Sequence, residues 1–545
     1  MPLATDVARA SDPNWLHGRL DGRRPQSDNS SFPPWSDATE RGRRAGLLLL
    51  LACLCFFLFG ASRGWKHNLS DRHGFRQTQT AISAYYMLQG PWTLAYETPV
   101  VGPPWSIPFE FPLYQWTVAA TARVSHLPLN QAGRLVSIVF FLLTLWPLAS
   151  ILRLMKLTVA HRLLIGALVV ASPFYVFWSR TFMIESTALF LALSYLAFVL
   201  AYAGGRKLWP VLAATAIGAL AAAVKITTFL PFAVAVQAVL LVGLWRDYRS
   251  GKSWRGLLGY CGAGLLMVAT PAIALLLWTH FADAHKAANL IGQHMTSKAL
   301  NTWNFGTLDQ RLSWQTWRTI LDHERLVLGS NYFVGVMALG LVFGRRRLQI
   351  VACLLLFVIA PLAFTNLYSV HDYYTYGSAI LLLTAVGISL VSLLERGPWH
   401  AGAAACLVCL MVGTFAHRYM SEYYPAQANQ YQNWDGIASQ VERVTAANET
   451  LLVLGYDWSS ELPYYCHRRA VMVPGWVPEI QNTASLLSVA MNLNVRHIVV
   501  HAAGQYNGFD AHELEALARA RGLGVERAYA DQELTIYRLV PERGT

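Results

Sequence analysis

The chain has 545 residues, of which 54% are hydrophobic and only 14% are charged, and its formal net charge is +12. Soluble domains carry about 25% charged residues, so this composition excludes an ordinary soluble protein and indicates a polytopic α-helical membrane protein. The Lys and Arg residues lie mainly at the ends of apolar runs. That is the positive-inside pattern, which excludes a nucleic-acid partner as the reason for the charge.

The first 44 residues are rich in Pro, Asp, Ser and Arg and show no apolar periodicity. We therefore interpret 1–44 as a disordered cytoplasmic tail. It is not a signal peptide, because the first apolar run begins too late. Arg41, Arg43 and Arg44 directly precede that run, 45–61, so the tail is expected to stay inside and the first helix to exit outward.

Eleven apolar runs follow one another along the chain, separated by polar segments. When they are taken in order as alternating spans, every cluster of two or more basic residues falls on the cytoplasmic side. We therefore predict about eleven transmembrane helices in a membrane domain of residues 45–417, in the inner (plasma) membrane. The N-terminus is expected inside and the C-terminus outside. The runs with the clearest limits are 45–61, 135–152, 163–178, 210–224, 257–280 and 403–415.

Residues 418–545 differ in character from the apolar part. Short buried-strand signals at 451–455, 470–474 and 497–501 alternate with helical stretches at 430–446 and 511–521. This alternation predicts a small extracytoplasmic α/β domain. Because the domain lacks a glycine-rich phosphate loop, we expect a cap or an acceptor-docking surface and not a nucleotide site.

The long first outer loop, 62–131, gathers carboxylates, arginines, a histidine and aromatic rings next to the membrane. Polar groups at such a place are costly unless they pair or bind something. The predicted sidedness brings further polar residues to the same outer face, where we expect one outward-facing cavity. They are Arg180, Glu185, Lys225, His371, Asp372, Tyr373 and Tyr374.

These residue types match the needs of a transferase with a membrane-embedded donor. A carboxylate serves as base for an acceptor hydroxyl, cations stabilise a leaving phosphate, and apolar helices hold a lipid tail. The outer segment 283–332, with several tryptophans, is interpreted as an amphipathic piece lying on the membrane near the donor entrance.

Three segments carry a resemblance to a known family: YMLQGPW at 86–92, PLYQW at 112–116 and RTFMIE at 180–185. Over about residues 45–417 the chain resembles the glycosyltransferase C superfamily, in the branch of the protein O-mannosyltransferases and lipid A aminoarabinose transferases. The resemblance implies an integral-membrane inverting glycosyltransferase. Such enzymes move a sugar from a polyprenyl-phosphate (or dolichyl-phosphate) donor to an extracytoplasmic hydroxyl of a glycan, lipid or protein.

The chain departs from this branch at the residues that carry charge. Much of the branch has an Asp-Glu pair upstream of the Met of this loop, where this chain has Arg76 and Gln77, and a Lys just before Pro-Leu-Tyr, where it has Glu110. We expect Glu110 or Asp71 to be the catalytic base, with Glu110 ahead, and Glu185 to inherit the role if neither is. The expected donor-phosphate and substrate-binding residues are Arg76, His73, Gln77, Arg180, Lys225, His371, Tyr373 and Tyr374.

Plainer interpretations stay open for these residues. Glu185 suits a helix N-terminus, Lys225 suits snorkelling to the headgroups, and His371 with the tyrosines suits an interfacial belt. Asp71 and Glu110 would serve equally to hold the loop by pairing with nearby arginines. The sequence supports no cofactor, because Asp71 and His73 are too few ligands for a divalent metal.

Two other functions compete with the transferase. A lipid-linked oligosaccharide ligase or polymerase would share the same membrane plan. A transporter is disfavoured, because the charged residues gather at the outer face and not at mid-membrane, and no inverted repeat is visible.

Overall fold

The computed structural model describes residues 40–429, 433–501 and 508–542. Most of the predicted tail, 1–39, lies outside the described residues. The last residues of the predicted tail, 40–44, are not disordered, because they form the start of helix α1 (Glu40–Ser62). Glu40 accepts hydrogen bonds from Arg43 and Arg44 at 3.0 and 3.2 Å, and these pairs at helical spacing stabilise the first turns.

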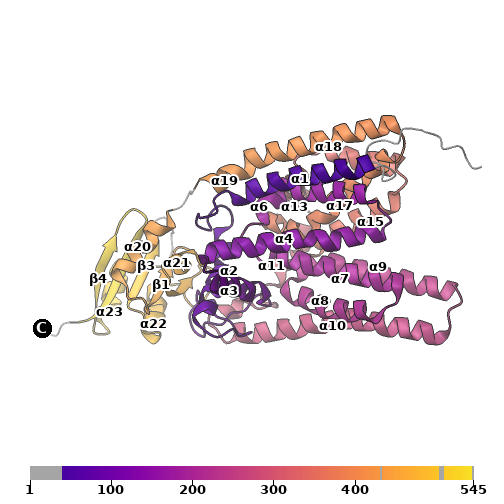
Figure 1. The fold of residues 1–545 in the computed structure, drawn as a ribbon. Coiled ribbons are helices and arrows are strands. Elements are labelled where there is room, and N and C mark those ends of the chain that lie inside the picture. The colour runs from indigo at the N-terminus through magenta and orange to yellow at the C-terminus, as the bar shows by residue number, and fades with distance from the viewer. Residues whose placement is uncertain (1–39, 430–432, 502–507, 543–545) are drawn as a thin grey trace, which may run out of the picture.

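Long apolar helices run side by side and form a bundle (Figure 1). Seven segments in the described part of the chain are long and apolar enough to cross a membrane, and an eighth is a pair of helices bent by 84°. The chain is a helical membrane protein, as predicted. The seven segments are α1, α4 (Leu129–Leu154), α7 (Glu185–Gly205), α9 (Ile226–Arg249), α10 (Trp254–Ala287), Asp372–Leu394 with α17 (Tyr376–Leu394), and Pro398–Ala428 with α18 (Pro398–Arg418).

The remaining predicted spans fall on other apolar helices. Three are shorter: α5 (Val159–Ala171), α8 (Leu208–Val224) and α15 (Arg347–Ala363). The bent pair consists of α13 (Trp314–Leu328) and α14 (Tyr332–Phe343). Every predicted span thus coincides with an apolar helix, whereas the number that crosses the membrane stays a prediction.

Helix α17 forms the centre of the bundle, since all of its residues are buried. Small residues let its neighbours approach closely. A Cβ at Gly387 would lie 2.6 Å from Ile165 of α5, and a Cβ at Gly340 of α14 would lie 2.5 Å from Ser389. The outer helices instead expose leucine and valine side chains, as a lipid-facing surface requires.

The first outer loop contains helices α2 (Gly74–Gln89) and α3 (Leu113–Ser125). Both lie at the end of the bundle that faces the C-terminal sheet (Figure 1). Short helical elements connect the long helices: α6 (Pro173–Trp178), η1 (Gly292–Met295), α11 (Asn301–Phe305), α12 (Leu308–Leu312), α16 (Thr365–Val370), η2 (Asp372–Thr375), η3 (Tyr419–Tyr423) and α19 (Tyr424–Ala428).

The C-terminal part is a five-stranded sheet with helices, which confirms the predicted α/β class. The strand order is β2-β1-β3-β5-β4, parallel among β2, β1 and β3 and antiparallel for β3–β5 and β5–β4. The strands are β1 (Thr450–Leu454), β2 (Arg469–Val473), β3 (His497–His501), β4 (Leu523–Ala530) and β5 (Leu534–Pro541). The helices are α20 (Trp434–Val444), α21 (Glu461–Tyr465), α22 (Thr483–Asn492) and α23 (Ala511–Arg519).

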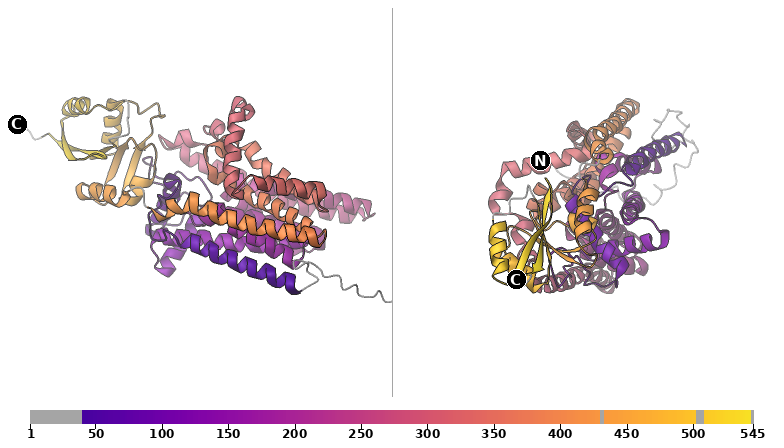
Figure 2. Two further views of the ribbon diagram at one scale, coloured as in Figure 1. Left: turned by 90° about the horizontal axis from the view of Figure 1, so that it is seen from above. Right: turned by 90° about the vertical axis from the view of Figure 1, so that its left-hand side faces the viewer.

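The sheet sits beyond one end of the helical bundle, as the left view of Figure 2 shows. The first outer loop joins it at the edge strand β2, where Val101 forms an antiparallel bridge with Val471. Ala470 N donates to Pro99 O at 3.0 Å and Met472 N to Val100 O at 2.8 Å. The loop therefore acts as a further strand at this edge and fixes the sheet against the membrane part.

Candidate active site

A buried ion pair between Asp71 and Arg180 anchors the first outer loop. Arg180 Nη1 donates to Asp71 Oδ2 at 2.5 Å, and the two side chains are 0% and 6% exposed. Gln77 Nε2 donates to the other carboxylate oxygen at 2.8 Å, while its own Oε1 accepts from Phe182 N at 2.9 Å. Three of the predicted site residues, Asp71, Gln77 and Arg180, are thus committed to one another.

This pairing decides the charge state of Asp71. Burial by itself would raise the pKa of the Asp71 carboxyl, but the positive charges of Arg180 and Arg134 outweigh it and hold the pKa below its ordinary value. Arg134 also donates to backbone oxygens of the same loop, those of Trp65, His67 and Asn68. A carboxylate with a lowered pKa inside such a network is a weak base and a strong anchor.

Glu110 has a more open environment. It forms an ion pair with Arg76 in the first turn of α2, and the two side chains are 14% and 15% exposed. Arg76 Nη1 also donates to Gln79 Oε1 at 2.7 Å. The Tyr96 hydroxyl accepts from Phe109 N and donates to Glu110 O, each at 3.0 Å, so the backbone before α3 is fixed. The Glu110 carboxylate is therefore well positioned, and within the described part of the chain its one ion pair is the pair with Arg76.

Lys225 and Glu185 form a second ion pair nearby. Lys225 lies in extended backbone where α8 ends and α9 begins, and Glu185 is the first residue of α7. The lysine is only 9% exposed and lies over the ring of Tyr374, 4.5 Å from its centroid. It does not snorkel to the surface. Glu185 Oε2 has no hydrogen-bond partner among the described residues.

His73 links the start of α2 to the segment around η2. Its Nε2 lies 3.1 Å from Asp372 Oδ1, and its ring contacts those of His371 and Tyr373 at 5.4 and 5.0 Å between centroids. Burial, with a further effect of His73, lowers the pKa of His371 to about 4, so that imidazole is neutral at neutral pH. Tyr373 stacks on Tyr374 at 4.9 Å.

The two ion pairs and these rings belong to one cluster. Arg76 pairs with Glu110, and its charge also acts on both Lys225 and His371, so the two ion pairs are electrostatically coupled. We call this set the polar cluster; it comprises His73, Arg76, Glu110, Glu185, Lys225, His371, Tyr373 and Tyr374. Five separate stretches of chain supply it, and it lies beside the buried Asp71–Arg180 network.

The structure adds residues that the sequence did not single out. The ammonium of Lys286, in the last turn of α10, lies 4.7 Å from the centroid of the Phe109 ring, next to Glu110 in the chain. Tyr96 orders the Glu110 backbone, as described above. A lysine at a helix C-terminus and a tyrosine in an aromatic loop are ordinary features, so neither carried a distinctive signal. Within the described ranges, no three His, Cys, Asp or Glu side chains form a group that would hold a metal ion.

No family model matches the chain, and no curated protein matches its sequence. Solved structures match it along most of its length. ArnT from Cupriavidus metallidurans bound to undecaprenyl phosphate has a TM-score of 0.58 at 15% identity, covering 89% of this chain and 97% of ArnT. The oligosaccharyltransferase AglB from Archaeoglobus fulgidus, in complex with an inhibitory peptide and a dolichol-phosphate, has a TM-score of 0.54 at 10% identity, covering 85% and 70%.

The arabinofuranosyltransferase AftD from Mycobacteria is a third match, with a TM-score of 0.52 at 13% identity. The match covers 91% of this chain and 41% of AftD, so the chain spans less than half of that protein. At such identities the likenesses show a shared fold, which extends over 85–91% of this chain.

Proposed function

We propose that this chain, whose fold is that of the glycosyltransferase C superfamily, is an integral-membrane inverting glycosyltransferase. It moves a sugar from a polyprenyl-phosphate donor to a hydroxyl of an extracytoplasmic glycan, lipid or protein. The observation that carries the proposal is the polar cluster, in which a partly open carboxylate, Glu110, pairs with Arg76, and the charge of Arg76 in turn acts on Lys225 of the second ion pair. The lipid phosphates bound by ArnT and AglB support the class of donor.

Each group in the cluster has a task in this reaction. The acceptor hydroxyl oxygen attacks the anomeric carbon from the face opposite the phosphate, and its proton passes to the Glu110 carboxylate. The bond between the anomeric carbon and the phosphate oxygen breaks, and its electron pair leaves on the polyprenyl phosphate. Arg76 and Lys225 stabilise that developing charge.

The resting ion pairs fit these tasks. A donor phosphate competes with Glu110 for Arg76 and with Glu185 for Lys225, so its arrival frees the base at the time when the base is needed. The rings of Tyr373, Tyr374 and the neutral His371 then contact the sugar. We assign Asp71, Gln77 and Arg180 to positioning the loop instead of to the donor.

Replacing Arg76 by Gln is expected to weaken donor use by about 2–5 kcal/mol, the scale for losing one partner of a desolvated charge pair. Lys225→Gln is expected to do the same, and it is best combined with Glu185→Gln so that no buried carboxylate is left alone. The measurement is the donor KM in purified protein. Arg63→Gln, an exposed cation at the end of α1, is the matched control. Unchanged donor KM in both variants would exclude these cations from the donor site.

We further propose the arrangement in the membrane and the domain limits. The N-terminus is cytoplasmic, the C-terminus is outside, and the domain of 45–417 is followed by an extracytoplasmic domain of 418–545 in a protein of the inner membrane. In support, helix α2, which carries Arg76, and the sheet lie toward one end of the bundle, whereas α15, which begins in the basic run 345–347, lies toward the other end (Figure 1).

A phosphatase that is active only outside the cytoplasm, fused after Thr545, is therefore expected to be active. The same fusion after Arg347, in the basic run, is the inactive control. Inactivity of the C-terminal fusion at equal expression would contradict the topology. Labelling of the Cys466 thiol with a membrane-impermeant reagent does not test the topology. The thiol is fully buried, and burial raises its pKa to about 12, so it would not react from either side.

The function itself is tested by incubating the purified protein with radiolabelled polyprenyl-phosphate sugars and envelope extracts. Transfer of label from the monophosphate donor is expected. Transfer only from a pyrophosphate-linked glycan would favour the second candidate, a lipid-linked oligosaccharide ligase, which the likeness to AglB supports. Absence of transfer from either donor would contradict the glycosyltransferase. Mass spectrometry of envelope glycans with and without the protein identifies sugar and acceptor.

A further inference from the structure

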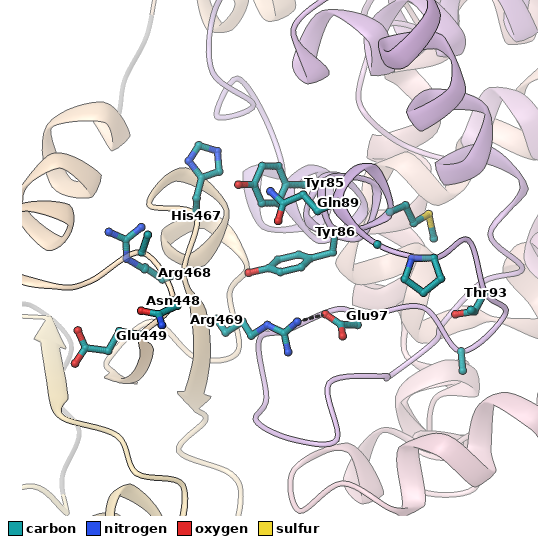
Figure 3. Close-up of a pocket in the computed structure, with 15 residues that line it drawn as sticks. Tyr85, Tyr86, Gln89, Thr93, Glu97, Asn448, Glu449, His467, Arg468 and Arg469 are labelled. Carbon is teal, nitrogen blue, oxygen red and sulfur yellow. Dashed lines mark hydrogen bonds and ion pairs between the residues drawn. The ribbon is translucent and has the colours of Figure 1, made fainter.

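A pocket of about 760 Å³ lies where the first outer loop meets the C-terminal domain. One wall is the C-terminal end of α2, and the other comes from the segments before β1 and β2 (Figure 3). Its volume is within the range of small-molecule sites. The residues of the polar cluster do not line it, so it is a separate feature of the outer face.

Both walls of the pocket are held in place. The pairing of 99–102 with β2 joins the loop to the sheet, as described above. Arg469 Nη2 donates to Glu97 Oε2 across the boundary at 2.7 Å. The ring of His467 stacks on Tyr85, with 4.7 Å between centroids. The pocket is therefore preformed and does not depend on a ligand to order it.

The lining combines flat rings with planar polar groups. The guanidinium of Arg469 lies over the ring of Tyr86, 5.3 Å from its centroid, and Figure 3 shows the Arg469 side chain passing Tyr86 and pointing to Glu97. The amides of Gln89 and Asn448 offer both donors and acceptors. Aromatic faces pack against the C–H faces of sugar rings, and amides, carboxylates and guanidinium groups bind their hydroxyls.

The charges of the lining argue for a neutral ligand. The negative charges of the Glu97 and Glu449 carboxylates balance the positive charges of the Arg468 and Arg469 guanidinium groups. Arg469 is paired with Glu97, and Arg468 donates to the backbone oxygens of Cys466 and Thr445. Among the described lining residues neither guanidinium is left free for a lipid phosphate, and the few aliphatic side chains offer little surface for a lipid tail.

The pocket is connected to the polar cluster in two ways. Arg76 and Tyr86 lie on the same helix, ten residues apart, which corresponds to about 15 Å along the helix axis. Glu97 of the pocket follows Tyr96, whose hydroxyl holds the backbone of Glu110. An extended acceptor bound in the pocket would therefore reach Glu110, whereas a single sugar would not.

We propose that this pocket binds the neutral glycan portion of the acceptor and that Tyr86 and Arg469 are its main contacts. The proposal rests on the function proposed above. In this proposal the C-terminal domain contributes to acceptor binding. It supplies one wall of an acceptor subsite and thereby selects an oligosaccharide-bearing acceptor.

The test is Tyr86→Ala in the full-length protein, with an envelope extract as acceptor. The KM for the acceptor is expected to rise about tenfold or more, with a much smaller change in donor KM. Tyr86→Phe keeps the ring and is expected to restore most of the affinity. Trp476→Ala removes a 46% exposed ring of the same domain outside the pocket and is expected to match the wild type. An unchanged acceptor KM in Tyr86→Ala would overturn the proposal.

A direct titration separates this inference from the proposed function. Short defined neutral oligosaccharides are titrated into wild-type protein and into Tyr86→Ala by calorimetry. Binding to the wild type that Tyr86→Ala loses supports the pocket, even if no polyprenyl-phosphate sugar is ever transferred. Absence of binding to the wild type, or equal binding to both proteins, overturns it whatever the result of the transfer assay.

Discussion

Replacing Glu110 by Gln is expected to lower turnover by about 10²–10⁴-fold, which is the range that a positioned general base contributes. The amide keeps the size of the side chain but takes up no proton from the acceptor. Because Arg76 loses its resting partner while keeping its own charge, donor affinity is expected to stay near the wild-type value or to rise. Turnover and donor affinity are therefore measured together in the same preparation.

A control separates this effect from a general loss of negative charge. Glu479 is 40% exposed and pairs with His294 away from the polar cluster, so Glu479→Gln is expected to leave turnover unchanged. Near-normal turnover in Glu110→Gln would remove Glu110 as the base. Glu185, with its unpartnered carboxylate oxygen, would then be the next residue to replace.

Replacing Asp71 by Asn is expected to destabilise the protein by about 3–5 kcal/mol, the scale for removing one partner of a buried ion pair. The Arg180 side chain, 0% exposed, would keep its charge without a counter-ion. The expected result is a lower yield and a lower unfolding temperature in detergent, with turnover of the folded fraction reduced far less than in Glu110→Gln. Asp322→Asn is the control, because its pair with Arg325 is about half exposed and worth about 0–1 kcal/mol.

The lowered pKa of Asp71 also sets the pH dependence of this contribution. A carboxyl whose pKa is lower in the folded state stabilises that state fully above its ordinary pKa, about 3.9, and loses the contribution as the pH falls through the folded value. The unfolding temperatures of wild type and Asp71→Asn should therefore converge in strong acid. If they instead differ little at neutral pH, Asp71 is not an anchor and is again a candidate for the base.

The different environments of Asp71 and Glu110 show what the local sequence cannot predict. Asp71 and Glu110 both stand in the same loop beside arginines, and the sequence offered each as base. Their difference comes mainly from Arg180, which lies 109 residues beyond Asp71 and forms a buried ion pair with it. Likewise Lys225 is 40 residues from Glu185, and snorkelling stayed open as an alternative for this lysine until the tertiary contacts were known. Pairings at such separations depend on how helices pack, and no local pattern encodes that.

The sequence by itself determined the membrane class, the apolar helices and the helix–strand alternation of the C-terminal part. These features follow from hydropathy, from basic residues at helix ends and from side-chain periodicity. All three signals can be read from a short local stretch of sequence. Strand β4 was missed because it is an exposed edge with little apolar alternation. Only the tertiary structure decided which ion pairs form, that Tyr96 orders Glu110, and that β2 and α2 enclose a pocket. Each of these depends on contacts between segments that are distant in the sequence. Such contacts stabilise the fold only after folding has buried both partners side by side.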